Sequence, residues 1–219
     1  MTTDRRLSLI AGLLYLATFV TSIPALAMKT PFLTHGTEPA LAVGGALLEV
    51  ALAGACIGTA VALYPILRKR AEVSALGFVA ARTVEAGLIL FGVAALLALT
   101  SLPDAAVPTG AVLIELHRWA FLLGPGLIPA INALLLGTVL LRHRLVPRLI
   151  PAIGLIGAPL LAASAVATLA GLVDQVSPLA GAAALPIAVW ELSIGLWLTF
   201  RGIRVESPSR PTPGVPSGT

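Results

Sequence analysis

The sequence has few charged residues, few aromatic residues and a single cysteine. Only 11% of its 219 residues are charged and 5% are aromatic, whereas 58% are hydrophobic and the mean hydropathy is +0.99. Soluble domains carry about a quarter of charged residues, so this chain is too apolar to face water and its solvent is lipid. Because Cys56 is the only cysteine, an intrachain disulfide and a thiolate metal cluster are both excluded.

The formal net charge of +4 does not indicate a nucleic-acid partner. The basic residues form short clusters between apolar runs instead of one basic face. We therefore expect the lipid bilayer as the partner and no nucleic acid. The sequence names no substrate and no oligomeric state.

Six apolar runs are each long enough to cross the hydrocarbon as a helix, which takes about 20 residues. They are roughly 7–28, 40–67, 74–99, 119–141, 149–173 and 179–200. The alternating pattern of barrel strands is missing from them. We therefore predict an all-α, polytopic membrane bundle of about six transmembrane helices over 1–204. Residues 205–219, rich in Pro, Ser and Gly, are predicted to form a disordered cytoplasmic tail.

The basic residues predict the orientation of the bundle. Of 14 Lys and Arg residues, 11 fall before the first run, after the last run, or in alternate connections, and only Lys29 and Arg118 fall in the opposite loops. By the positive-inside rule both termini are cytoplasmic, as in a multi-pass protein of a cell inner membrane. The first run also resembles a signal peptide, but its apolar stretch of about 20 residues exceeds the usual 7–15, so we expect it to be retained.

Four charged residues lie inside apolar runs, where each charge costs about 2.5–3.5 kcal/mol at the bilayer centre. They are Glu49, Arg82, Glu85 and Glu191. Arg82 and Glu85 are three residues apart and can pair on one helix face. At about 1.5 Å of rise per residue from the ends of the runs, all four residues and Asn132 lie near the middle of the bilayer. We predict an intramembrane polar cluster of these five residues.

Three glutamates against one arginine leave two surplus negative charges in this cluster. A proton, a bound cation or an amine substrate would each balance them. The alternative is a structural network whose charges only hold the helices together. Both interpretations stay open at this point.

The fourth run contains a second unusual feature, Gly124-Pro125-Gly126 followed by Pro129. These residues remove backbone hydrogen bonds and predict a kinked or broken helix. A kink that serves packing is the preferred interpretation, and a break that frames a binding site is the alternative. His35, His117 and His143 fall in or near loops without a second ligand nearby, so no metal or cofactor is predicted.

Several short motifs, in order along the chain, resemble one known family. They are Gly12-Leu13-Leu14-Tyr15-Leu16, Leu63-Tyr64-Pro65-Ile66-Leu67-Arg68, Arg82-Thr83-Val84-Glu85-Ala86, Leu145-Val146-Pro147-Arg148, Trp190-Glu191, Gly195-Leu196-Trp197-Leu198 and Arg201-Gly202. From about residue 5 to 204 the chain resembles the bacterial membrane proteins grouped as domain-of-unknown-function family 4386. The resemblance implies a multi-span protein of the bacterial inner membrane and carries no settled activity to any residue.

Three functional hypotheses follow. A small transporter, or a proton- or cation-coupled protein, would use the glutamates as exchange groups in a cavity that water can reach. A structural or partner-binding membrane protein would have the same charges fully paired and sealed. An intramembrane enzyme acting on a lipidic substrate comes third, because no nucleophile or metal motif accompanies the glutamates and no catalytic residue can be named.

Overall fold

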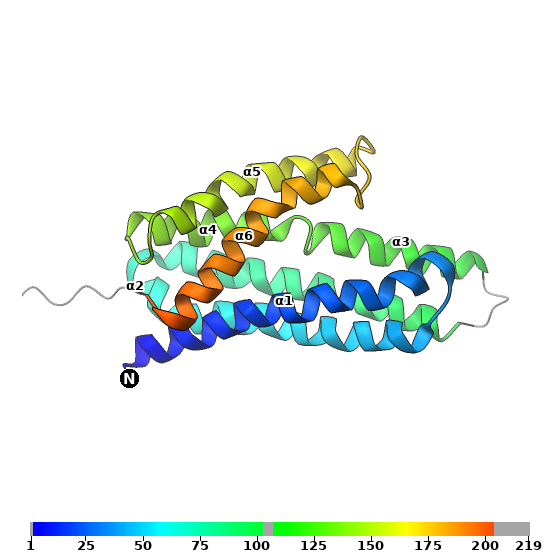
Figure 1. Cartoon of the computed structure of the whole chain (residues 1–219), viewed down its shortest axis with the longest axis horizontal. Helices are drawn as coiled ribbons and strands as arrows, with labels where there is room; N and C mark the ends of the chain where they lie inside the picture. Colours follow the sequence, from blue (N-terminus) through cyan, green and yellow to red (C-terminus); the bar gives the residue numbers. More distant parts are fainter. Residues whose placement is uncertain (1, 103–106, 204–219) are drawn as a thin grey trace, which may run out of the picture.

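The computed structural model describes residues 2–102 and 107–203 and consists of six helices (Figure 1). The helices are α1 (Thr3–His35), α2 (Pro39–Thr100), α3 (Val107–Leu123), α4 (Ile128–Arg142), α5 (Leu149–Leu169) and α6 (Pro178–Phe200). The described residues contain no β-strand, which confirms the predicted all-α class. The predicted tail, 205–219, lies outside the described residues.

Five helical stretches are long and apolar enough to cross a membrane: α1, α2, the α3–α4 stretch, α5 and α6. The 62 residues of α2 would extend about 93 Å as one straight helix, three times the thickness of a hydrocarbon core. Its helical geometry is interrupted at Ala71, where φ is −154° and ψ is 76°. The chain reverses there, so residues 39–70 and 72–100 form two arms that run in opposite directions (Figure 1).

The reversal of α2 lies at the same end of the bundle as the N-terminus (Figure 1). The α4–α5 connection and the last residue of α6 lie at this end as well. We call it the basic end, because it carries Arg5, Arg68, Arg144, Arg148 and Arg201. The α1–α2 and α5–α6 connections lie at the opposite end.

Near the basic end, α1 and α6 are in close contact. A Cβ added to Gly12 would lie 2.5 Å from the backbone nitrogen of Thr199, and one added to Gly195 would lie 3.0 Å from Tyr15. Arg5 donates hydrogen bonds to the carbonyl oxygens of Leu198 at 2.9 Å and Thr199 at 2.7 Å. These are among the last carbonyls of α6, which have no partner inside their own helix. Residues from the two ends of the sequence therefore close the bundle.

Two apolar cores divide the interior. The larger core gathers buried residues of α1, α2, α4, α5 and α6, with Tyr15, Phe78 and Trp190 as its largest members. The smaller core joins the two arms of α2 through residues such as Ala46, Cys56, Ala86 and Leu96. Arg82 has contacts with both cores, with Tyr15 and Phe78 of the larger and with Cys56 of the smaller.

Candidate functional site: charged groups around an intramembrane cavity

Arg82, on the second arm of α2, is the centre of a buried ion-pair network. Its Nη1 atom is 3.1 Å from Oε2 of Glu85, and its Nη2 atom is 2.7 Å from Oε1 of Glu191 on α6. Asn132 on α4 donates a hydrogen bond of 2.8 Å to the same Oε2 of Glu85. We call these four residues the Arg82 group. It joins α2, α4 and α6 and includes the predicted i, i+3 pair.

Neighbouring side chains enclose the guanidinium of Arg82. Nη1 is 3.6 Å from Sγ of Cys56 on the first arm of α2. The guanidinium carbon lies 5.1 Å from the ring centre of Tyr15 and 5.8 Å from that of Phe78, distances at which an aromatic ring attracts a cation. The motif residues Tyr15, Arg82, Glu85 and Glu191 therefore lie together in space.

Glu49 does not join the Arg82 group and forms an ion pair with Lys29 of α1 instead. Only 2% of the Lys29 side chain and 8% of the Glu49 side chain are exposed. Lys29 Nζ also lies 5.0 Å from the ring centre of Phe121 on α3. The apolar run ends before Lys29 and predicts this residue in an outer loop, but α1 continues to His35 and Lys29 is buried in the interior.

The two groups lie at different depths along the bundle. Counting from the helix ends at the basic end, Arg82 and Glu191 lie about 14–17 Å along their helices. Lys29 and Glu49 lie about 32–39 Å along theirs. For a hydrocarbon core about 30 Å thick that begins just past the basic residues of these helix ends, the Arg82 group lies near the midplane. The Lys29–Glu49 pair then lies at the opposite boundary.

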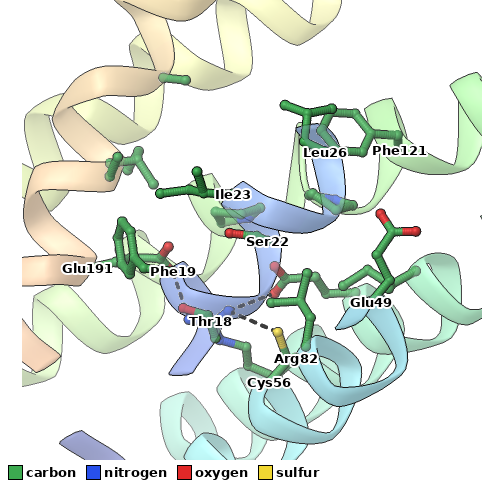
Figure 2. Close-up of a pocket in the computed structure, with 18 of the residues that line it drawn as sticks. Thr18, Phe19, Ser22, Ile23, Leu26, Glu49, Cys56, Arg82, Phe121 and Glu191 are labelled. Atoms are coloured by element: carbon green, nitrogen blue, oxygen red, sulfur yellow. Dashed lines mark hydrogen bonds and ion pairs between the residues drawn. The ribbon is translucent and has the colours of Figure 1, made fainter. Parts of the chain in front are cut away.

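A cavity of about 430 Å³ connects the two groups. Its wall includes Lys29, Glu49, Arg82, Glu85 and Glu191. Most of the other lining residues are apolar and come from α1, α2, α5 and α6, as well as from the α3–α4 region. Figure 2 shows Glu49 and Glu191 on opposite sides of this space. A volume of this size is typical of small-molecule sites, which are mostly apolar with a few polar groups.

The cavity opens sideways between α1 and α6, in the halves of these helices farther from the basic end. Ile23 and Leu26 line it from α1 and are 65% and 50% exposed, and Ala184 and Ala188 line it from α6. Toward the basic end the cavity is closed, because Tyr15, Ile194 and Leu198 are fully buried where α1 meets α6. In a bilayer, the apolar rim at Ile23 and Leu26 faces acyl chains.

The helix is interrupted at the predicted glycine–proline segment. α3 ends at Leu123, a turn follows over 124–127, and α4 begins at Ile128. A Cβ on Gly124 would lie 2.9 Å from Leu88 Cβ, and one on Gly126 would lie 2.5 Å from the Leu122 carbonyl oxygen, so both positions require glycine. Pro125 and Pro129 line the cavity, and irregular backbone inside a membrane is tolerated where it lines a cavity.

Sequence reasoning missed a buried role for His117 as well as for Lys29. His117 is buried on α3, and its Nδ1 lies 2.8 Å from the carbonyl oxygen of Gly92. With the proton on Nδ1, the ring donates a hydrogen bond that ties α3 to the second arm of α2. Ala120, three residues further on, lies on the same helix face, and both side chains lie close to Gly92.

The charges of the cavity wall do not balance. Lys29 and Arg82 face Glu49, Glu85 and Glu191, which leaves one surplus negative charge when all five are ionised. Oε2 of Glu49 is buried and has no hydrogen-bond partner among the described residues, and the same holds for Nε of Arg82 and Oδ1 of Asn132. Buried polar atoms without partners cost stability, so this part of the interior is not fully satisfied by its own side chains.

The fold and the apolar helices define a multi-pass helical membrane protein. Residues 10–202 match the family described as Domain of unknown function (DUF4386), and the chain belongs to this family. The predicted family is thereby confirmed. The searches of curated proteins and of solved structures gave no significant match.

Proposed function

We propose that this protein is a small transporter of a bacterial inner membrane, which takes a solute into the cavity between α1, α2 and α6. One observation carries the proposal: the cavity reaches the carboxylates of both charged groups inside the bundle. Purely structural ion pairs in lipid are expected to be sealed by their neighbours. A charged residue that lines an intramembrane cavity is typical of a substrate or ion pathway.

We infer six crossings with both termini in the cytoplasm. The two arms of α2 each have the length for one crossing, and with the other four stretches they make six. The arginines and lysine of the basic end are the expected mark of the cytoplasmic side. In this orientation the cavity opens in the outer half of the membrane and is closed toward the cytoplasm.

In this proposal the surplus carboxylate couples transport of the solute to the binding of a positive charge. Three carboxylates and two cations attract one proton or one cationic group to the cavity. Release toward the cytoplasm requires α1 and α6 to separate at Gly12 and Gly195, where they are now in contact. The interruption at 124–127 gives the cavity wall a hinge, because broken helices often frame the sites of transporters.

Thiol accessibility tests the proposal without knowledge of the substrate. Cys56 is the only cysteine, so Cys56→Ala gives a background for single cysteines. Ser22→Cys and Ala188→Cys place a thiol in the cavity wall on α1 and α6. Ser193→Cys is the matched control, since it lies on α6 near the depth of Glu191 and outside the cavity lining.

A membrane-impermeant thiol reagent is added to right-side-out and to inside-out vesicles that contain each variant. A transporter that alternates between two faces exposes Ser22→Cys and Ala188→Cys from both sides, while Ser193→Cys stays unmodified in lipid. If folded protein carrying either cavity cysteine resists the reagent from both sides, the transport proposal is wrong.

One observation favours a structural role as the second candidate. Arg82 is paired with two carboxylates and enclosed by Tyr15 and Cys56, as expected for a side chain that holds helices together. Under this alternative the cavity stays closed to water, and the same experiment gives unmodified cysteines at all three positions.

A further inference from the structure

We propose that the cavity binds an amphipathic monocation, with an ammonium-type head and a compact apolar body. This inference rests on the proposed function and names the substrate class of the same cavity. Its first support is charge. Three carboxylates against two cations leave room for one positive charge, and a negative or strongly polar neutral ligand would bring no compensation.

Glu191 is the carboxylate best placed to hold the head group. It shares Arg82 with Glu85, so one guanidinium compensates two carboxylates. Its side chain is 15% exposed, against 5% for Glu85 and 8% for Glu49, and it lines the cavity on α6. A head group beside it gains a charge-assisted hydrogen bond, which is about twice as strong as a neutral one.

Glu49, on the cavity wall opposite Glu191, gives independent support for a ligand site. More than nine tenths of its side chain is buried, and Oε2 has no partner among the described residues. Figure 2 shows its carboxylate turned from α2 toward Phe121. Lys29 compensates the charge of Glu49, so this atom adds an unpaired acceptor to the wall, while the surplus charge belongs to the carboxylates that share Arg82.

The remaining wall determines the body of the ligand. The same cavity is lined by apolar side chains that offer no hydrogen bonds, those of Phe19, Ile23, Leu26, Leu161 and Ile187. The rim residues Ile23 and Leu26 are exposed between α1 and α6, where acyl chains lie. A ligand that dissolves in the bilayer interface can therefore reach the cavity sideways, apolar body and cationic head together.

Three probes of one shape test the class: 4-phenylbutylamine, 4-phenylbutanol and 4-phenylbutyrate, which are cationic, neutral and anionic at neutral pH. Their binding to the full-length protein in lipid nanodiscs is measured by calorimetry. We expect the amine to bind at least tenfold more tightly than the alcohol and the carboxylate not to bind. Equal affinities for amine and alcohol would overturn the proposal, because the surplus charge would then play no part.

Variants locate the site. Glu191→Gln should weaken amine binding at least tenfold, and Glu49→Gln should weaken it less. Glu115→Gln, on the exposed part of α3 outside the cavity, is the charge-matched control and should leave it unchanged. Ala188→Leu narrows the cavity without changing its charge and should also abolish binding of the amine. This second variant keeps the proposal testable if Glu191→Gln fails to fold.

The outcomes separate this inference from the proposed function. If Ser22→Cys and Ala188→Cys react with the thiol reagent while the amine fails to bind, the substrate class is wrong and the transport proposal stands. If the cysteines are inert, the proposed function itself is wrong. If Glu191→Gln and Glu115→Gln bind the amine equally, Glu191 does not hold the head group and the proposal is overturned.

Discussion

Arg82 has partners on both arms of α2 and on α1 and α6, whereas Lys29 has one carboxylate and one aromatic ring. Arg82 also lies near the middle of the bundle, and Lys29 lies close to the end of its helix. A buried cation with several partners compensates several groups at once, so its loss leaves all of them unpaired. We therefore expect Arg82 and Lys29, which are equally buried, to contribute unequally to the stability of the bundle.

The largest expected effect is that of Arg82→Met. The change leaves Glu85 and Glu191 without their counter-charge near the midplane, and breaking a buried pair in this way costs about 3–5 kcal/mol. We expect a large drop in thermal stability in detergent, or no accumulation of folded protein. Adding Glu85→Gln should recover part of the loss. An unchanged melting temperature for Arg82→Met would show that the network adds nothing to stability.

A smaller effect is expected for Lys29→Met. It leaves only Glu49 without a partner, at a depth near the membrane boundary where water or a proton is close, so we expect a loss of about 1–3 kcal/mol. The double variant Lys29→Met, Glu49→Gln should regain most of it in the same unfolding assay. A larger loss than for Arg82→Met would reverse the comparison between the two groups.

Effects no larger than that of Lys29→Met are expected in the same unfolding assay for the glycines that pack beside each group. A Cβ at Gly154 would lie 2.6 Å from the ring of Trp190, next to Glu191, and one at Gly45 would lie 3.0 Å from the carbonyl oxygen of Ala25, near Lys29. Overpacking costs about 1–3 kcal/mol, so we expect Gly154→Ala to lose more than Gly45→Ala.

Gly87→Ala is the control for these glycine variants, because nothing lies within 4 Å of its added Cβ. Alanine is the better helix former, so this variant should be neutral or slightly stabilised. If Gly154→Ala behaves like Gly87→Ala, the ring of Trp190 is free to move, and the Arg82 group is less firmly packed than its contacts indicate.

The all-α fold could be predicted because long apolar runs leave few structures for a backbone in lipid. The contact of Arg82 with Glu85 follows from the helical repeat, and the interruption at 124–127 follows from the missing donors of the prolines. These features depend on residues close together in the sequence. Such residues meet whatever the tertiary packing is.

The partner of Glu49 could not be predicted, because it depends on how far α1 extends. Hydropathy falls at Lys29, and a lysine at the end of an apolar run is usually placed at the interface. The helix instead continues through Pro31 to His35 and packs along the first arm of α2. The apolar runs contain three glutamates and one arginine. This imbalance was the available signal that a further cation, Lys29, lies inside the bundle and not in a loop.

The contact of Arg5 with the last carbonyls of α6 has a consequence for synthesis. A ribosome makes α1 before α6, so Arg5 can form these hydrogen bonds only after residues 198 and 199 have been translated. Until then α1 and α6 are not in contact, and the carbonyl groups that Arg5 binds have not been synthesised. Docking of α6 against Gly12 and Tyr15 therefore cannot precede the synthesis of α6, and a chain that stops before Leu198 lacks the carbonyl groups that Arg5 binds.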